Sequence, residues 1–495
     1  MPLYEGRHNA ENKIYISDEV KSTIAFTTEE TLKRLQTLIE ETEGAVALDG
    51  WYGVDYLAIA EALKKKGCQA EFINANTLYR DQEQIAAYKQ PFITDDPGFG
   101  YCNMDGRLTD LMDPGKIEEL RERLKAGVVV FGCGAAVPEL YDSYGRTLYL
   151  DKTRQPLLWQ MWDGKLAPFG LDTPKESYDW KEYYYCDYFL LHFQKHYLIE
   201  RMDYYIEAIS IDSMKLMPRE SYDAVVRTML KYPIKEVEIY QPGPWGAYRY
   251  KDFWEIKGLE CNAWNELAGP ELSILIDVGG REPLNMPFVN LMQYADDLVG
   301  PYLNQTYPHL FPLDAWLDDG YFPEKTPAER ISMPIHTHPS TDYVKRHFNE
   351  PIGRYETYYI AEAYEGANTW MGFYNEADLE EWERKCRESN NLKEISDWKD
   401  YICNWESRVG DLYLIPPGTD HGHGGNQMVL ELDTCPSIAG TEYSFFEYDF
   451  ARNSWDDDKK EMTGNPLKMH LDHAVNMEKN RRESWVKDHL LARPS

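Results

Sequence analysis

A set of residues suited to metal binding stands in the second half of this chain. His336 and His338 lie two positions apart in Ile335-His336-Thr337-His338-Pro339, and Glu356 and His421 follow further along. Alternate side chains of a β-strand point to the same face, so both imidazoles of the pair can face one cavity. Three imidazoles and a carboxylate form a ligand set that divalent first-row metal ions accept. These residues therefore predict a metal centre.

The residues that precede His421 support this prediction. Gly410, Pro416 and Gly418 stand before it, and the segment stays rich in turn residues up to Asn426. Such residues favour a tight turn, which would present His421 at the end of a strand. We expect one divalent metal ion per chain, with Zn²⁺ favoured and Mn²⁺ or Fe²⁺ as alternatives.

Two further residues near this segment could take part in proton transfer. His423 could carry a proton or orient a metal ligand, or it could be a surface histidine in a glycine-rich loop. Glu431 lies on the strand expected after His421, where it could act as a base or support a metal ligand. The residue types alone leave these alternatives open.

The elements that position these residues are expected to be β-strands. After residue 232, short apolar or alternating runs recur between turn residues, at 237–240, 273–276, 358–361, 368–372, 411–415, 428–432 and 443–446. This texture is typical of an all-β antiparallel sandwich or jelly roll. We expect two helical inserts within it, at 287–299 and 376–390.

The first half of the chain shows the layout of a phosphate-binding loop. An amphipathic helix, a buried strand, a glycine-containing loop and a second helix are expected at 28–43, 45–48, 49–55 and 56–66. Strand, glycine loop and helix are the order found in such loops. Here Gly53 is followed by Val54 and Asp55 instead of lysine and a hydroxyl residue, and the acid would repel phosphate. We therefore expect a βα turn without kinase chemistry.

The rest of the first half favours an α/β domain with a parallel sheet. Further strands are expected at 70–74, 128–132 and 146–151, with a charged helix at 113–125. An aromatic-rich helical stretch over 176–207 has an apolar spacing that favours packing over a ligand site. We place the domain boundary after residue 231, which gives an α/β domain over 1–231 and an all-β domain over 232–495.

Composition limits the partners and the compartment. The net charge of −32 argues against nucleic acid and anionic membranes, which bind basic surfaces. No apolar run approaches the length of a membrane span, and the eight cysteines include no C-x-x-C pair. We expect a reduced, cytoplasmic protein with a small-molecule partner, and a homo-oligomer is compatible with the sequence.

Taken together, the motifs of the second half resemble a known family. Residues from about 240 to 486 are similar to cupins of the class I mannose-6-phosphate isomerase type. Pro242-Gly243-Pro244-Trp245-Gly246 is similar to that family's Pro-Trp-Gly motif, and residues 335–339 stand at its Gln-x-His-Pro metal pair. Glu356 and His421 match its other two ligands. Tyr448-Asp449-Phe450-Ala451-Arg452 matches its Tyr/Trp-Asp-x-x-Arg segment, which implies that Arg452 is the active-site arginine.

The resemblance implies a fold and an activity. The fold would be a cupin, preceded by a domain that resembles uridine-kinase-like P-loop domains and has lost their phosphate-binding residues. The activity would be metal-dependent aldose–ketose isomerisation of a mannose- or fructose-type sugar or sugar phosphate, through an enediolate. Arg452, Glu431 and His423 would be its catalytic residues. A cupin oxygenase or decarboxylase and a non-catalytic sugar-binding protein are the alternatives.

Several positions depart from the family's pattern. His336 replaces the metal-binding glutamine, and Arg354 stands near the place of a lysine that often precedes the metal-binding glutamate. Pro334 and Asn465 replace a serine and a lysine that contact phosphate in the family, with Lys468 as the nearest substitute. The sequence therefore leaves open whether the sugar is phosphorylated.

Overall fold

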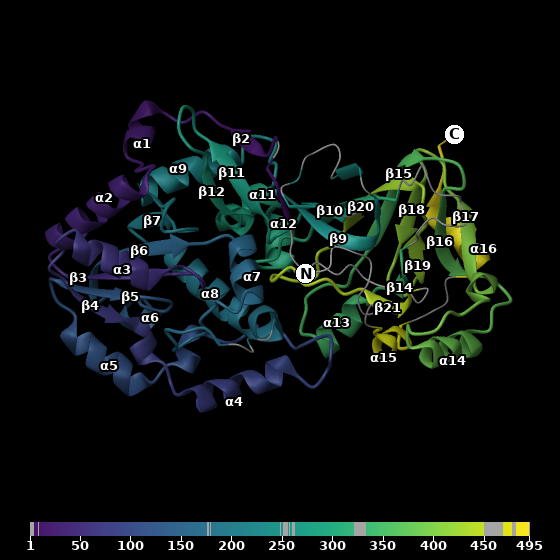
Figure 1. Ribbon diagram of the computed structural model, residues 1–495, viewed down its shortest axis with the longest axis horizontal. Helices are drawn as coiled ribbons and strands as arrows, with labels where there is room; N and C mark the ends of the chain where they lie inside the picture. The colour runs from purple at the N-terminus through teal and green to yellow at the C-terminus, as the bar shows by residue number, and fades with distance from the viewer. Residues whose placement is uncertain are drawn as a thin grey trace. The chain divides into compact units, whose positions relative to one another are not determined.

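The chain divides into two compact units, which are described separately (Figure 1). The computed structural model describes residues 4–7, 9–175, 178, 180–247, 249–250, 256, 258–259, 263–320, 333–449, 469–477 and 482–494, with backbone alone at 242–247 and 263. One unit, here called the α/β unit, comprises Asn9–Glu236 and Glu271–His309. The other, the β unit, comprises Met1–His8, Val237–Pro270 and Leu310–Ser495.

The α/β unit is built on a six-stranded sheet. Its strands lie in the order β4 (Glu71–Asn74), β5 (Val128–Phe131), β3 (Ala45–Gly50), β6 (Tyr144–Asp151), β7 (Tyr204–Glu207) and β8 (Lys215–Pro218). Neighbouring strands are parallel except β7 and β8. The predicted parallel sheet is therefore present, with the first of its strands, β3, in the interior of the sheet.

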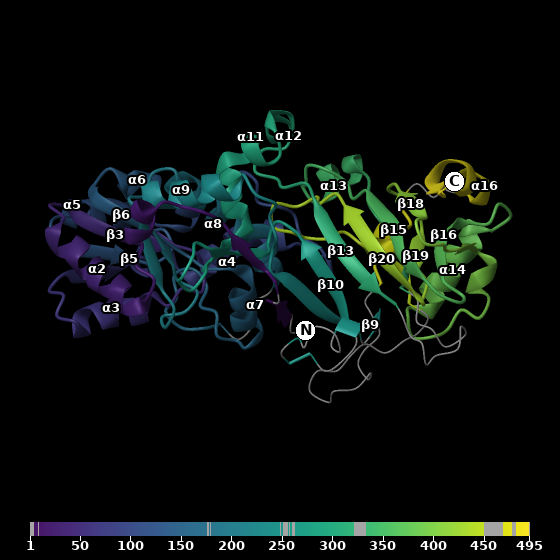
Figure 2. The same ribbon diagram turned by 90° about the horizontal axis from the view of Figure 1, so that it is seen from above.

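Helices pack on both faces of this sheet (Figures 1 and 2). α2 (Thr28–Glu41) begins with a capping box between Thr27 and Glu30, and its Leu35 and Ile39 join one apolar cluster with residues of the sheet. Ile59 and Leu63 of α3 (Tyr56–Lys65) belong to the same cluster. α5 (Pro114–Arg123) and α6 (Pro138–Tyr141) lie on the other face.

Part of the predicted helical stretch over 176–207 forms a strand instead. α8 spans Tyr188–Ile199 after a π-helical turn at Glu182–Asp187, and Tyr204–Glu207 form β7. Pairing with β6, from Leu148↔Tyr204 to Asp151↔Glu207, decides the local conformation there. Such pairing lies outside the reach of a local sequence pattern.

The segment 271–309 belongs to the α/β unit, although the sequence analysis assigned it to the second domain. β11 (Ser273–Asp277) pairs with β12 (Leu284–Pro287) and, in parallel, with β2 (Glu11–Lys13). The backbone N–H of Asn285 donates to Glu207 at 2.9 Å, and Arg154 forms an ion pair with Glu271. The predicted helical insert is present here as a 3₁₀ helix at Phe288–Tyr294, called η4, and α11 (Ala295–Leu298). The predicted boundary after residue 231 thus lies close to the observed division between residues 236 and 237. The prediction missed that residues 271–309 belong to the α/β unit again.

The loop between β3 and α3 is filled by groups of the protein itself. The carboxylate of Asp55 accepts the backbone N–H of Ala58 at 3.0 Å and so caps α3. The carbonyl of Gly53, which has a φ of 72°, accepts hydrogen bonds from Lys152 at 2.7 Å and Gln160 at 3.2 Å. The N-terminus of α3 therefore carries a negative charge at the place where a nucleotide-binding loop binds phosphate.

A pocket of ≈ 270 Å³ lies beside this loop. Its lining includes Val54, Asn76 and Cys133, which follow β3, β4 and β5 respectively. These are the carboxyl ends of adjacent parallel strands, where α/β sheets bind their ligands.

We expect MgATP at millimolar concentration to leave the melting temperature of the protein unchanged. A ligand that binds only the native state raises that temperature, but the carboxylate of Asp55 opposes a phosphate at the start of α3. Differential scanning fluorimetry with and without MgATP, with Mg²⁺ alone as control, measures this. A melting temperature that rises with ATP concentration would contradict the prediction.

The β unit contains two antiparallel sheets. The eight-stranded sheet has the order β1 (Tyr4–Gly6), β9 (Glu238–Ala247), β10 (Ala263–Ala268), β13 (Asp314–Asp319), β20 (Gln427–Asp433), β15 (Glu356–Ala363), β18 (Leu412–Ile415) and β22 (Leu491–Ala492). Figure 2 shows β9, β10, β13, β20 and β15 side by side. The five-stranded sheet has the order β17 (Ile402–Glu406), β16 (Asn368–Phe373), β19 (His421–His423), β14 (Ile335–Thr337) and β21 (Phe445–Tyr448).

The two sheets share an apolar core. Met371 of β16, in the five-stranded sheet, packs with Tyr358 and Ile360 of β15 and with Tyr413 of β18, in the eight-stranded sheet. The alternation of buried and exposed residues along β20 is that of a strand with one face in a core. The predicted antiparallel β-structure is thus confirmed for this unit, and the predicted insert at 376–390 is α14 (Leu379–Ser389).

Within the described residues, every helix is too short or too polar to cross a lipid bilayer.

Candidate metal centre

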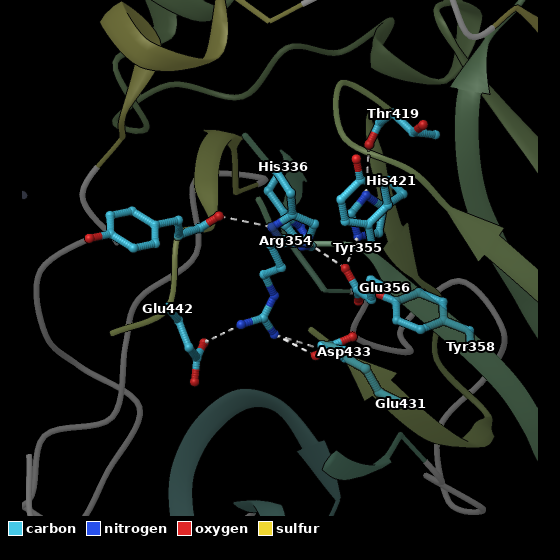
Figure 3. Close-up of polar contacts among 12 residues, drawn as sticks. His336, Arg354, Tyr355, Glu356, Tyr358, Thr419, His421, Glu431, Asp433 and Glu442 are labelled. Carbon is cyan, nitrogen blue, oxygen red and sulfur yellow. Dashed lines mark hydrogen bonds and ion pairs between the residues drawn. The ribbon is translucent and has the colours of Figure 1, made fainter. Parts of the chain in front are cut away.

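The predicted metal ligands come from both sheets of the β unit (Figure 3). His336 lies on β14 and pairs with His421 on the neighbouring β19, and His338 follows the end of β14. Glu356 begins β15 in the other sheet. Gly418, with a φ of 77°, donates its N–H to the carbonyl of His338 at 3.0 Å, so the predicted turn before His421 is tied to the histidine pair.

The four side chains converge on one point between the sheets. One ligand atom from each of His336, His338, Glu356 and His421 lies within 4.8 Å of the others. One oxygen of Glu356 lies 2.9 Å from Nε2 of His421 and also contacts Nε2 of His338. The ring centroids of His336 and His421 are 4.2 Å apart. The structure therefore brings together all four residues that the sequence predicted as ligands.

Backbone carbonyls select one tautomer of each histidine. Nδ1 of His336 lies 2.9 Å from the carbonyl oxygen of Pro334. Nδ1 of His338 lies 2.9 Å from the carbonyl oxygen of Tyr443, and Nδ1 of His421 lies 2.8 Å from that of Thr419. A carbonyl only accepts hydrogen bonds, so Nδ1 must carry the proton in each ring. The lone pair is then on Nε2, the nitrogen that can bind a metal ion in the centre.

Burial and charge set the ionisation that metal ligands need. All four side chains are buried. Burial lowers the pKa of His336 well below its usual value and also lowers the pKa of His338, which favours the neutral imidazoles. Burial alone would raise the pKa of Glu356, but His421 and His338 outweigh it and hold that pKa well below its usual value. Neutral imidazoles beside a carboxylate are the forms that bind divalent metals.

One buried atom supports a further ligand at this point. Oε1 of Glu356 has no hydrogen-bond partner among the described residues, although it is buried. An unpartnered buried polar atom costs roughly 1–3 kcal/mol, so such atoms usually face an ion or a water molecule. The residues present therefore fit a divalent metal ion bound by three imidazoles and one carboxylate.

Substitution of both His338 and His421 by asparagine should lower the metal content of the purified protein by one ion per chain. The double variant leaves His336 and Glu356 of the four candidate ligands, and a structural or catalytic zinc site needs at least three protein ligands. Inductively coupled plasma mass spectrometry measures the content. The control is His489→Asn, because His489 is exposed and forms a hydrogen bond with the carbonyl of Trp485, away from the candidate ligands. Equal metal content in wild type and His338→Asn/His421→Asn would contradict the assignment.

A buried ion-pair network adjoins the candidate ligands (Figure 3). Arg354 donates to Asp433 at 2.6 Å and to Glu431 at 3.3 Å, and it lies 3.8 Å from Glu442. Asp433 and Glu431 also lie within 4.8 Å of Glu356 through their carboxylate oxygens. Burial raises the pKa of Glu431 and of Asp433, and the negative charge of Glu356 adds to both shifts. Arg354 opposes the shift at Asp433, so it stabilises a concentration of acid that would otherwise be costly to bury.

Substitution of Arg354 by methionine should destabilise the protein by about 3–5 kcal/mol, since it leaves two buried carboxylates without their cation. Urea denaturation followed by tryptophan fluorescence measures the change. The control is Arg408→Met, which breaks an exposed ion pair with Glu406 and should cost less than about 1 kcal/mol. Equal stability of the two variants would contradict a structural role for Arg354.

The structure describes two of the three predicted catalytic residues, and these two lie in different places. Glu431 lies on β20 opposite Tyr358, on the same face as Asp433 and near Glu356. His423 is buried rather than on the surface, and its Nε2 lies 3.2 Å from Asp318 on β13. The ring of Tyr358 lies 5.6 Å from that of His421 and 5.9 Å from that of His423. Arg452 and the substituted phosphate position Asn465 lie outside the described residues.

The sequence analysis did not identify Asp433 and Asp318 as parts of this region. A signal was available for Asp433, because it stands two positions after Glu431 and directly after the strand predicted at 428–432, so one more strand residue places it on the same face. No comparable signal exists for Asp318. Its position opposite Val429 follows from the pairing of β13 with β20, which joins segments far apart in the chain.

Comparisons with known proteins cover parts of the chain. Residues 28–231 match the family model of a domain of unknown function, DUF8485. A probable mannose-6-phosphate isomerase, GmuF of Bacillus subtilis, is 25% identical over 154 residues, which are 31% of this chain and 45% of that protein. The mannose-6-phosphate isomerase of Streptococcus mutans is 25% identical over 29% of this chain and 39% of its own length. The chain thus spans less than half the length of these curated relatives.

Part of this chain is similar to mannose-6-phosphate isomerases. Among solved structures, the mannose 6-phosphate isomerase from Bacillus subtilis has a TM-score of 0.38 and 19% identity, over 53% of this chain and 71% of that one. A zinc-bound mannose 6-phosphate isomerase has a TM-score of 0.35 and 10% identity, over 53% of this chain and 77% of that one.

Proposed function

We propose that this protein is a metal-dependent sugar isomerase that interconverts an aldose and a ketose of the mannose/fructose type. The observation that carries the proposal is the convergence of His336, His338, Glu356 and His421, with three Nε2 lone pairs and one carboxylate directed at a single point. The partial similarity to mannose-6-phosphate isomerases supports it. The β unit would be a cupin domain, and the protein would act in the cytoplasm.

The chemistry divides between a metal ion and the side chains around it. Zn²⁺ is the favoured ion, with Mn²⁺ or Fe²⁺ as alternatives; when bound, it would polarise the sugar carbonyl and stabilise the enediolate as a Lewis acid. The protein must supply a group that takes a proton from the carbon next to the carbonyl and returns it one carbon along. This proton carrier has to lie close to the metal ligands without being one of them.

Glu431 is our first candidate for the proton carrier. It lies within 4.8 Å of Glu356, and its raised pKa makes it a stronger base once ionised than an exposed glutamate. Arg354 holds it by a hydrogen bond of 3.3 Å, which fixes the carboxylate beside the centre. His423 is the second candidate, through its contact with Asp318. By resemblance to the family, Arg452 would bind a substrate oxygen or stabilise the oxyanion.

The carboxylates beside the metal ligands bear on the choice of sugar. Glu356, Glu431 and Asp433 lie together, and Arg354 is already bound to two of them. Neutral hydroxyl groups tolerate this environment better than a phosphate dianion. We therefore propose that the part of the substrate nearest the metal ion is uncharged, whether or not a phosphate is present elsewhere on the sugar.

For the α/β unit, we propose a P-loop-kinase-like domain that has lost nucleotide chemistry. Support comes from the loop after β3, which precedes a helix as in such domains but carries Asp55 at the helix N-terminus. The pocket of ≈ 270 Å³ at the same strand ends would then accept a ligand other than a nucleoside triphosphate.

The purified protein should interconvert at least one aldose–ketose pair from a panel that sets each free sugar beside its 6-phosphate. Chelation should abolish turnover, and Zn²⁺ or Mn²⁺ should restore it, because the reaction needs the Lewis acid. A coupled assay or NMR spectroscopy measures conversion. Unchanged turnover in the metal-free protein would contradict a metal-dependent isomerase. Metal-dependent oxygen consumption would support a cupin oxygenase, and tight sugar binding without turnover would support a non-catalytic sugar-binding protein.

Substitution of Glu431 by glutamine should lower kcat by roughly 10²–10⁴-fold with the metal content unchanged, which is the usual contribution of a general acid–base group. Steady-state kinetics and metal analysis of the same sample measure both quantities. Glu365→Gln is the control, since the side chain of Glu365 is exposed. A kcat within a factor of a few of wild type would exclude Glu431 as the proton carrier and direct the same test to His423.

A further inference from the structure

We infer that His192, His196 and His309 form a second metal site, which lies in the α/β unit and suits a divalent first-row ion such as Zn²⁺. One ring nitrogen of each histidine lies within 4.8 Å of the others. The ring centroids are separated by 4.7 Å for the pair 192–196, 4.3 Å for 196–309 and 5.5 Å for 192–309. Three nitrogens on one tetrahedral Zn²⁺ would be about 3.4 Å apart, so modest side-chain rotations close the set around an ion.

The chain brings these histidines together from two directions. His192 and His196 are four positions apart on α8, so they lie on one face of the helix a single turn apart. His309 ends the segment Glu271–His309 and has a φ of 66°, a conformation that non-glycine residues adopt infrequently. His309 stands in a turn, and its ring lies against that of His196.

An unpartnered buried atom points to a ligand at this cluster. Nε2 of His192 has no hydrogen-bond partner among the described residues, and the side chain is 2% exposed. Leaving such a nitrogen unsatisfied costs roughly 1–3 kcal/mol, and the neighbouring imidazoles offer it a shared metal ion as a partner. His196 and His309 are only partly buried, so an ion can reach the cluster from solvent.

A small cavity beside the cluster has room for a fourth ligand. The cavity of ≈ 10 Å³ is lined by His192 and His196 together with Asn290 and Gln293 of η4, and it has about the size of one water molecule. Oδ1 of Asn290 and Oε1 of Gln293 also lack hydrogen-bond partners within the described part of the chain. A water molecule on the metal ion could donate a hydrogen bond to one or both of these oxygens, which would complete four-coordination.

The lysine that lines the cavity does not prevent metal binding. Lys195 lines the same cavity, but both oxygens of Asp151 accept hydrogen bonds from its ammonium group, at 3.0 and 2.9 Å. Asp151 is buried as well, so the pair is close to neutral as seen from the histidines.

The site suits a structural role. Its helical part reads His192-Phe193-Gln194-Lys195-His196, so phenylalanine and glutamine stand where the His-Glu-x-x-His motif of metalloproteases has its glutamate base and the following residue. An ion at this place would join α8 to the end of the segment 271–309. It would thereby hold the segment Glu271–His309, which follows the first passage through the β unit, against the rest of the α/β unit.

The test uses the full chain with His338→Asn and His421→Asn in the background, which leaves two of the four candidate ligands of the centre in the β unit. The apo form of this variant should bind one equivalent of Co²⁺ with the visible absorption of a tetrahedral site, and Zn²⁺ should displace it. Adding His309→Asn or His196→Asn should abolish the binding of this equivalent of Co²⁺. Asparagine tolerates the positive φ at position 309, so this substitution should not strain the backbone. Adding His489→Asn should leave the binding of Co²⁺ unchanged.

Thermal unfolding separates a bound ion from a local fault in folding. Zn²⁺ should raise the melting temperature of the His338→Asn/His421→Asn protein and leave that of the same protein with His309→Asn added unchanged. Failure of the His338→Asn/His421→Asn protein to bind Co²⁺ or Zn²⁺, or equal binding after His309→Asn is added, would overturn the inference. Neither result would affect the proposed isomerase function, because that function depends on His421 and its neighbours alone.

Discussion

The contact of Glu356 with the imidazoles of His338 and His421 joins the two sheets of the β unit at their most polar point. Each of these groups is buried, and none could be buried alone without a large desolvation cost. Backbone carbonyls accept hydrogen bonds from Nδ1 of the histidines, so the Nε2 lone pairs of His338 and His421 face an oxygen of Glu356. The result is a polar centre whose free valences point inward. A metal ion satisfies that arrangement better than any single side chain could.

The acid concentrated around this centre explains why a buried arginine lies next to it. Glu431 and Asp433 share a face of β20 with the site, and without Arg354 their charges and that of Glu356 would repel one another. One cation therefore serves two purposes: it permits the burial of these acids, and it holds Glu431 beside the candidate reaction centre. Arginine cannot lose its proton under physiological conditions, so any proton transfer here has to involve another group.

The α/β unit places the N-terminus of α3 beside the carboxyl ends of its strands. The packing of α2 and α3 against the sheet in one apolar cluster holds this arrangement. Asp55 caps the helix that a phosphate would otherwise face. Polar groups suited to binding are instead found elsewhere in the unit, in the pocket beside that loop and in the histidine cluster of α8.

The sequence by itself determined the residues that could bind a metal, the β-structure that carries them and the parallel sheet of the first half. These follow from residue chemistry and from periodicities of two and about four positions, which are local properties. Only the tertiary structure decided that residues 271–309 return to the first unit, that Asp318 lies beside His423, and that His309 lies against α8. Each of these depends on strand pairing or packing between segments far apart in the chain. His196 and His309, for example, are more than a hundred positions apart. A local pattern carries no information about such partners, because the free energy that selects them comes from burial in the completed fold.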